Sequence, residues 1–198
     1  MKYLRNILIS ISLTSVLFLS ACSTVTIPYP LSANPKPIDK EKFEGVWDGG
    51  EPTVHVRFGS NGIAQIAWLD WADNEFQIVR AEMIVTEGDE NNFLSFRMEE
   101  DGKWTNTYVF CQYSFSDNGE LIVWNPNTET FEKAIEKGLL QGEVESGITG
   151  TTIAITNAPG KLLEFINDPE NLKLFEYRKP VILRKIVGVE KNEKKAEE

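Results

Sequence analysis

Histidine is almost absent from this sequence, which limits the chemistry that the chain can perform. His55 is the single histidine among 198 residues. We therefore expect neither a histidine-based catalytic triad nor a zinc site with several histidine ligands. No other catalytic or calcium-binding motif stands out from the sequence. The sequence thus predicts a protein that is not an enzyme, with no catalytic residue, no metal and no cofactor.

Basic residues are also in deficit. The chain has 20 lysines and arginines against 30 aspartates and glutamates, a formal net charge of -10 and a pI of about 4.8. Nucleic acid is bound through patches of positive charge, so we expect no nucleic-acid partner. The same charge disfavours adsorption of the folded domain to anionic lipid. Hydrophobic residues make up 41% of the chain, enough for the core of one domain.

The sequence has no apolar run long enough to span a bilayer. The main candidate, from Ile7 to Leu19, is interrupted by serines and a threonine, whereas a spanning helix needs about 20 apolar residues. Lys2 and Arg5 precede this run, and small residues follow it. A basic segment, an apolar segment and small residues in this order are typical of a secretory signal peptide.

The four residues Leu19-Ser20-Ala21-Cys22 end this segment. They resemble the lipobox of bacterial lipoprotein precursors, which implies cleavage between Ala21 and Cys22 and lipidation of Cys22. The family carries a diacylglyceryl group and usually a third acyl chain, such as palmitate. Each buried methylene contributes about 0.8 kcal/mol, so two or three chains anchor a protein stably in the lipid bilayer. The alternatives are an ordinary secretory signal and an uncleaved membrane helix.

The residue after Cys22 bears on the destination within the cell envelope. Ser23 stands where an aspartate retains enteric lipoproteins in the inner membrane. The resemblance therefore implies the outer membrane, facing the periplasm, in preference to the inner membrane. With Cys22 lipidated, Cys111 has no partner in the chain, and we expect no intrachain disulfide. Cys111 lies in the strand-like sequence 108–113, where we expect it to be a buried, small apolar residue.

Composition divides the chain into segments. We expect a signal peptide at 1–21, the lipidated cysteine and a proline-rich, poorly packed tether at 22–42, a β-barrel domain at 43–188 and a charged, disordered tail at 189–198. The tether is inferred from Pro28, Pro30, Pro35 and Pro37, which favour extended chain. The tail is almost wholly charged.

Alternating apolar and polar residues predict strands throughout residues 43–188. Residues 53–58 place Val54, Val56 and Phe58 on one face. Asn61-Gly62 and Asn118-Gly119 mark tight hairpin turns. About nine short strands with hairpin connections indicate an antiparallel barrel or sandwich. We therefore predict a mainly β fold, an antiparallel meander closing into a lipocalin-like barrel, with two short helices in the C-terminal half, near 130–137 and after Pro159.

The sequence Gly45-Val46-Trp47 opens the predicted domain. Gly-x-Trp in a first strand resembles the opening signature of lipocalins and related calycin barrels. The resemblance implies that Trp47 closes one barrel end and that an arginine of the last strand, here Arg184, covers it through a cation–π contact. It also implies that the interior carries a small apolar ligand. An interior filled by side chains is equally compatible with an eight-stranded barrel.

Aromatic and acidic residues cluster in 68–75. Asp70, Asp73 and Glu75 beside Trp68 and Trp71 suggest sugar binding or acid–base hydrolysis. A solvated acidic turn at a strand end explains the same residues. Trp68 and Trp71 have opposite strand parity, so they do not face one pocket without a bulge.

Two further aromatic residues, Tyr108 and Phe110, share one face of a long strand. Together with Trp68 and Trp71 they form the predicted surface for a ligand or partner.

Three functions remain open at this point. The first is a non-enzymatic, membrane-anchored envelope lipoprotein whose barrel binds a protein partner. The second is a carrier of a small apolar ligand, as the lipocalin resemblance implies. The third is a hydrolase that uses Asp70, Asp73 or Glu75. We rank them in this order because the sequence contains an anchor but no catalytic motif.

Overall fold

The computed structural model describes residues 23–31, 38–50, 52–72, 74–88, 91–147, 150–171 and 173–186. The predicted signal peptide, its cleavage site at Ala21 and Cys22, and the charged tail all lie outside these residues. Within the described part, no helix has the length and apolar character needed to cross a membrane.

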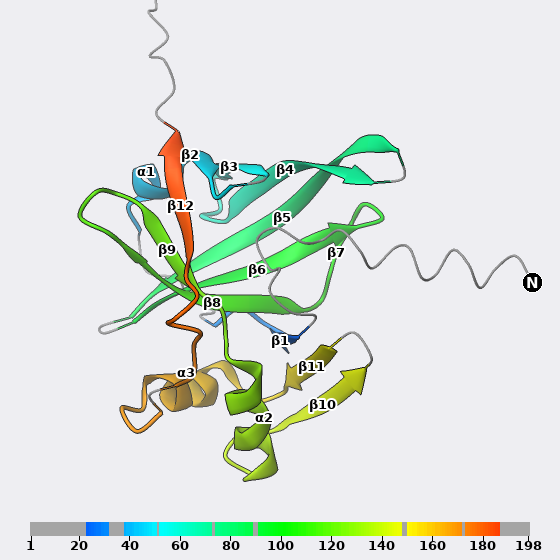
Figure 1. Ribbon diagram of the computed structural model, residues 1–198, viewed down its shortest axis with the longest axis vertical. Coiled ribbons are helices and arrows are strands. Elements are labelled where there is room, and N and C mark those ends of the chain that lie inside the picture. Colours follow the sequence, from blue (N-terminus) through cyan, green and yellow to red (C-terminus); the bar gives the residue numbers. More distant parts are fainter. Residues whose placement is uncertain are drawn as a thin grey trace, which may run out of the picture.

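Eight of the described strands form a closed antiparallel barrel (Figure 1). The final strand closes the ring, since it pairs with the first barrel strand on one side and with the strand that precedes the helices on the other. This confirms the prediction of a mainly β fold built around an antiparallel barrel. In order around the ring the strands are β2 (Gly45–Asp48), β3 (Thr53–Phe58), β4 (Ala64–Ala72), β5 (Glu75–Glu87), β6 (Asn92–Glu100), β8 (Tyr108–Phe115), β9 (Leu121–Trp124) and β12 (Val181–Ile186).

The turns follow the sequence pattern. Gly62 and Gly119 adopt φ values of 79° and 77°, a region that glycine enters without steric cost. Each therefore supports the tight hairpin that the Asn-Gly pairs predict. A short strand, β7 (Lys103–Trp104), pairs with the end of β6. A four-residue helix, α1 (Lys40–Phe43), precedes the barrel and was not predicted.

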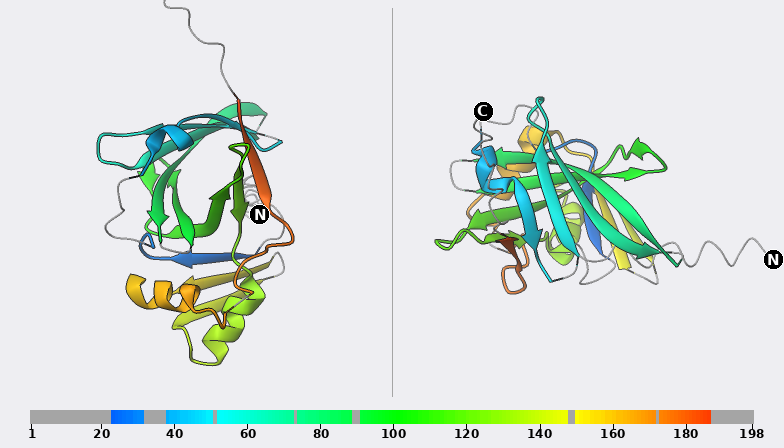
Figure 2. Two further views of the ribbon diagram at one scale, coloured as in Figure 1. Left: turned by 90° about the vertical axis from the view of Figure 1, so that its left-hand side faces the viewer. Right: turned by 90° about the horizontal axis from the view of Figure 1, so that it is seen from above.

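A small α/β unit is inserted between β9 and β12 and packs beside the barrel (Figures 1 and 2). Asn127 caps its first helix, where the side-chain Oδ1 accepts a hydrogen bond from the Thr130 N–H at 3.2 Å. Pro159 opens the second helix, a position that needs no N–H donor. Both helices lie where the sequence predicts them. The unit consists of α2 (Thr128–Glu136), β10 (Gly142–Gly147), β11 (Gly150–Ile155) and α3 (Pro159–Asn167).

The N-terminal segment 24–31 differs from the expected tether. Residues Thr24–Ile27 form strand β1, which lies between β8 and β11, antiparallel to the first and parallel to the second. Val25, Ile27 and Leu31 are buried. The alternation Thr-Val-Thr-Ile supplies one apolar face, and Pro28 and Pro30 fall after the strand, where their missing N–H groups remove no ladder bond. The folded structure therefore includes residues 23–31, which precede the expected start of the domain near Phe43.

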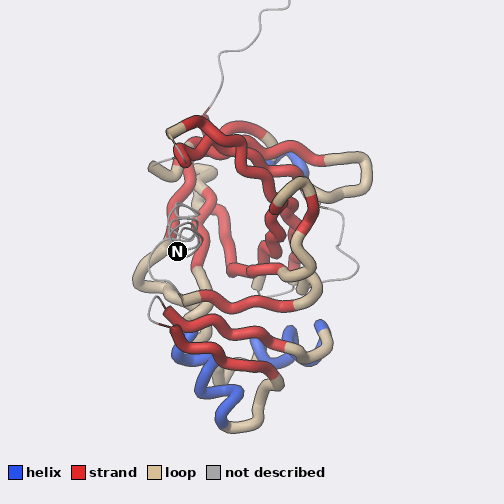
Figure 3. Tube along the Cα trace, turned by 90° about the vertical axis from the view of Figure 1, so that its right-hand side faces the viewer, coloured by secondary structure: helices blue, strands red, loops and turns tan. Residues whose placement is uncertain are grey.

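Two hydrophobic cores share the wall formed by β6 and β8. Leu94 and Cys111 face the barrel core, whereas their neighbours Phe93 and Phe110 face the core of the α/β unit. The tube view in Figure 3 shows β1 and the α/β unit beside the barrel ring. Alternation alone does not reveal this arrangement, because both faces of these strands are buried.

Candidate functional site

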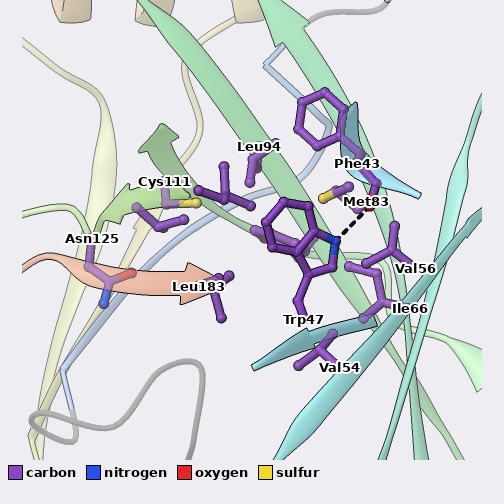
Figure 4. A pocket seen from close by; sticks show the side chains of 13 residues that line it. Phe43, Trp47, Val54, Val56, Ile66, Met83, Leu94, Cys111, Asn125 and Leu183 are labelled. Carbon is purple, nitrogen blue, oxygen red and sulfur yellow. Dashed lines mark hydrogen bonds between the residues drawn. The ribbon is translucent and has the colours of Figure 1, made fainter. Parts of the chain in front are cut away.

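The barrel interior is packed with side chains. Trp47 is 2% exposed, and its indole N–H donates a hydrogen bond to the Phe43 carbonyl oxygen at 2.7 Å (Figure 4). Leu94, Cys111 and Leu183 point toward the same space from three other strands. The remaining cavity has a volume of about 30 Å³, which holds only a few water molecules. The interior is therefore a core with a small void.

Cys111 lies fully buried in this core, as the sequence predicts. Burial raises the pKa of its thiol far above the ordinary value of 9.0. The reactive form of cysteine is the thiolate, which the apolar surroundings disfavour. Cys111 is thus a packing residue and not a nucleophile.

The cation over Trp47 is Lys185 and not the predicted Arg184. The Lys185 Nζ lies 5.6 Å from the centroid of the indole ring, and Lys185 is the cross-strand partner of Trp47. Arg184 has the opposite strand parity to the buried Leu183, so its side chain faces outward. There its Nε donates to Glu120 Oε1 at 2.8 Å. The contact expected from the lipocalin resemblance is therefore made by the next residue along the strand.

An exposed apolar surface lies on the outer face of the β4–β5 hairpin. Two cross-strand pairs form it, Leu69 with Ile78 and Trp71 with Phe76. The exposed fractions are 57%, 63%, 51% and 72%, respectively. The rings of Trp71 and Phe76 meet edge to face, with centroids 4.8 Å apart. We call these four residues the β4–β5 ridge.

Two shallow grooves lie near the ridge, and the first of them adjoins it directly. The first, of about 350 Å³, lies against Leu69 and Ile78 and extends to His55. The second, of about 340 Å³, shares His55 and Ala67 with the first and reaches Trp104. Its polar side chains include an ion pair, with Arg80 Nη1 3.5 Å from Glu99 Oε2. The first groove therefore connects the ridge to a surface that contains Arg57, Arg80 and Trp104.

Three of the four residues predicted as a partner surface do not lie on a surface. Trp68 is 8% exposed and belongs to the barrel core, while Tyr108 and Phe110 belong to the core of the α/β unit. Only Trp71 is exposed. Strand parity identifies its neighbour Leu69, and the hairpin register adds Phe76 and Ile78. The register of this hairpin is the signal by which the sequence could identify these residues.

Two carboxylates of the predicted hydrolytic cluster, those of Asp70 and Glu75, lie near the end of the β4–β5 hairpin. Asp70 Oδ1 accepts a hydrogen bond from the backbone N–H of Trp71 at 2.9 Å. Glu75 is exposed, and Asp73 lies outside the described residues. Neither Asp70 nor Glu75 lines the barrel cavity or the two grooves. Across the described ranges, no group of three or more His, Cys, Asp or Glu side chains has a geometry that could hold a metal ion.

Comparison with known proteins places the chain in no family. No family model, no curated protein and no solved structure matches it. Function is therefore inferred from the packed interior, the β4–β5 ridge and the two grooves.

Proposed function

We propose that the protein is a non-enzymatic lipoprotein of the bacterial cell envelope that binds a protein partner through the β4–β5 ridge. The lipobox resemblance of residues 19–22 supports anchoring through Cys22, with the outer membrane as the destination. The ridge supports the binding role. Neither part of the proposal depends on a catalytic group.

The observation that carries the proposal is the exposure of four adjoining large apolar side chains. Burying apolar surface is worth about 25 cal/mol per Å², so leaving such a patch in water forgoes a sizeable stabilisation. Contiguous patches of this kind mark interaction sites, and aromatic residues are prominent in interface centres. The neighbouring Arg57, Arg80 and Glu99 supply the polar rim that a protein interface needs.

A protein partner fits the ridge better than direct insertion into lipid. Glu75, the first residue of β5, is an exposed carboxylate at the end of the hairpin. Charged groups are costly within a bilayer, so the hairpin end is poorly suited to enter it first. A protein partner that lies along the flank of the hairpin covers the two cross-strand apolar pairs of the ridge. It leaves the Glu75 carboxylate at the hairpin end in water.

The packed interior argues against the second function, carriage of a small apolar ligand. Ligand pockets typically measure about 300–1,000 Å³, whereas the barrel cavity measures about 30 Å³. The outer surface is therefore the better candidate for binding.

Site-specific photo-crosslinking in cells tests the ridge. A photoreactive amino acid at position 76 is expected to give one adduct of discrete mass. The same amino acid at position 182 is the control, because Ile182 is 41% exposed on β12, away from the ridge. The serine substitution Trp71→Ser should abolish the adduct at position 76, while Ile182→Ser should leave it unchanged. Identical adducts from both positions, or none from position 76, would refute the partner proposal.

The anchor is tested separately. Cys22→Ala should release the protein from membranes or leave an unprocessed precursor. Membrane extraction and mass unchanged from the wild type would refute the lipid anchor while leaving the ridge untouched.

A further inference from the structure

The chain that connects the proposed anchor to the fold is very short. Cys22 directly precedes Ser23, whose side-chain oxygen accepts a hydrogen bond from the Thr151 N–H at 3.1 Å. Thr24, the next residue, is already paired with Thr152 in strand β11. Consecutive Cα atoms lie about 3.8 Å apart. A lipid group on Cys22 therefore sits within one residue of ordered structure.

The pairing and burial of strand β1 fix the position of Ser23 on the fold. It is bonded to strands on both sides, and Val25 and Ile27 are 2% and 1% exposed. Moving Ser23 away from the body of the protein would break these pairings and expose both side chains. The folded domain must therefore lie close to the bilayer surface, because no long linker separates Cys22 from strand β1.

The start of β1 lies beside the turn end of the β10–β11 hairpin, where Ser23 contacts Thr151. Ser146 and Thr151, which are cross-strand partners, lie next to the turn of that hairpin. Figures 1 and 2 show that the β10–β11 and β4–β5 hairpins point to the same side of the molecule. The connection between β8 and β9, which contains Asp117, lies at the opposite side. Ser23 and the β4–β5 hairpin thus lie on the same side of the molecule.

We infer that the short link holds the domain with the β10–β11 hairpin against the bilayer, so that the β4–β5 ridge meets a partner embedded in the same membrane. This inference rests on the proposed lipid anchor and partner-binding role, and it specifies the class of partner. The acidic charge of the domain disfavours adsorption to anionic lipid, so the lipid anchor and the short link alone hold the domain at the lipid surface. A membrane-embedded protein with an apolar face close to the headgroups matches the place and chemistry of the ridge.

Lipid quenching of a fluorophore tests the orientation. The lipidated full-length protein is reconstituted in phosphatidylethanolamine–phosphatidylglycerol vesicles that contain headgroup spin-labelled lipid. A thiol-reactive fluorophore is placed by Ser146→Cys, Glu75→Cys or Asp117→Cys. Cys111 is fully buried and will not react in the folded protein. We expect the strongest quenching at position 146, less at position 75 and only background at position 117.

A spacer variant provides the matched control. A flexible glycine–serine spacer is inserted between Cys22 and Ser23, and it begins with serine so that the residue after Cys22 is unchanged. The difference in quenching between positions 146 and 117 should then disappear. In cells, the protein without the spacer should give an adduct from position 76 that contains a membrane-embedded protein. In the spacer variant this adduct should be lost or strongly reduced.

The possible outcomes distinguish the orientation inferred here from the proposed lipid anchor and the proposed partner-binding ridge. Protein that fails to float with the vesicles would refute the anchor and the inference together. Floating protein with equal quenching at positions 146 and 117 would refute only the orientation. A position 76 adduct that contains a soluble periplasmic protein, or that is unaffected by the spacer, would overturn the membrane-embedded partner and leave the ridge as a binding site.

Discussion

Trp47 shows how strand parity assigns a contact that residue type alone leaves ambiguous. Arg184 and Lys185 are neighbouring cations on the last strand, and only Lys185 is on the same face as Trp47. Its Nζ also donates to the Glu41 carbonyl oxygen at 2.6 Å. Lys185 therefore links α1 to Trp47 on β2.

The two cations should differ in their effect on stability. Lys185→Met keeps the apolar part of the side chain but removes the cation–π contact, and we expect a loss of about 0.5–1 kcal/mol in the free energy of unfolding. Arg184→Met should leave stability unchanged, because its ion pair with Glu120 is exposed. Urea unfolding of both variants measures the difference. An equal effect from both substitutions would contradict the assignment.

Tyr113 gives the stability a dependence on alkaline pH. Burial is the main reason that the pKa of its phenol is raised well above the ordinary value of 10.0, and the nearby Glu87 carboxylate adds to the effect. The folded state therefore retains the proton while the unfolded chain ionises. Stability is fully present below about pH 10 and decreases as the pH rises above it.

The prediction is a decline in the free energy of unfolding above about pH 10 that is less steep in Tyr113→Phe. Cys111 contributes in the same direction from about pH 9, since burial also raises its pKa. Unfolding measured at intervals between neutral and alkaline pH gives both slopes. Parallel curves for the wild type and the variant would show that Tyr113 is not responsible.

Among the secondary-structure elements, β1 is the strand that the proline-rich composition of residues 22–42 did not predict. It completes the sheet between the barrel and the α/β unit and contributes Val25 and Ile27 to the second core. A soluble domain that begins at Pro37 would lack it and would leave the edges of β8 and β11 unpaired.

Strand β1 should therefore be necessary for full stability. Ile27→Ala is expected to cost about 2–5 kcal/mol, the usual range for a fully buried isoleucine. Thr152→Ala, at an exposed position on the neighbouring β11, should change stability by less than about 0.5 kcal/mol. Chemical denaturation of soluble domains that begin at Ser23 provides the measurement. Equal stability of domains that begin at Ser23 and at Pro37 would show that β1 contributes nothing.

In the whole molecule, the inserted α/β unit covers one part of the outer surface of the barrel and leaves another part in solvent. The unit and β1 cover the outside of β6 and β8, where Phe93 and Phe110 are each 1% exposed. The outside of β4 and β5 lies away from the unit, and Phe76 there is 72% exposed. The same kind of side chain is thus a core residue in one region and a candidate binding residue in the other.

The sequence by itself determined the barrel strands and their hairpin turns, because alternation and Asn-Gly turns are local properties that each short segment expresses independently. It also determined both helices of the α/β unit through their caps and apolar spacing. The proposed anchor is likewise contained in a few consecutive residues.

Only the tertiary structure decided which outward-facing apolar residues are covered. Tyr108, Phe110 and Trp71 look alike in the sequence, and Trp68 differs from Trp71 only in parity. Their burial depends on whether another layer packs against that part of the sheet, which is a non-local property. The tertiary structure also fixed β1, because its pairing partners lie more than 80 residues away at Tyr108 and more than 120 away at Thr152. The sequence thus predicted the strands, while the packing between distant segments determined the site.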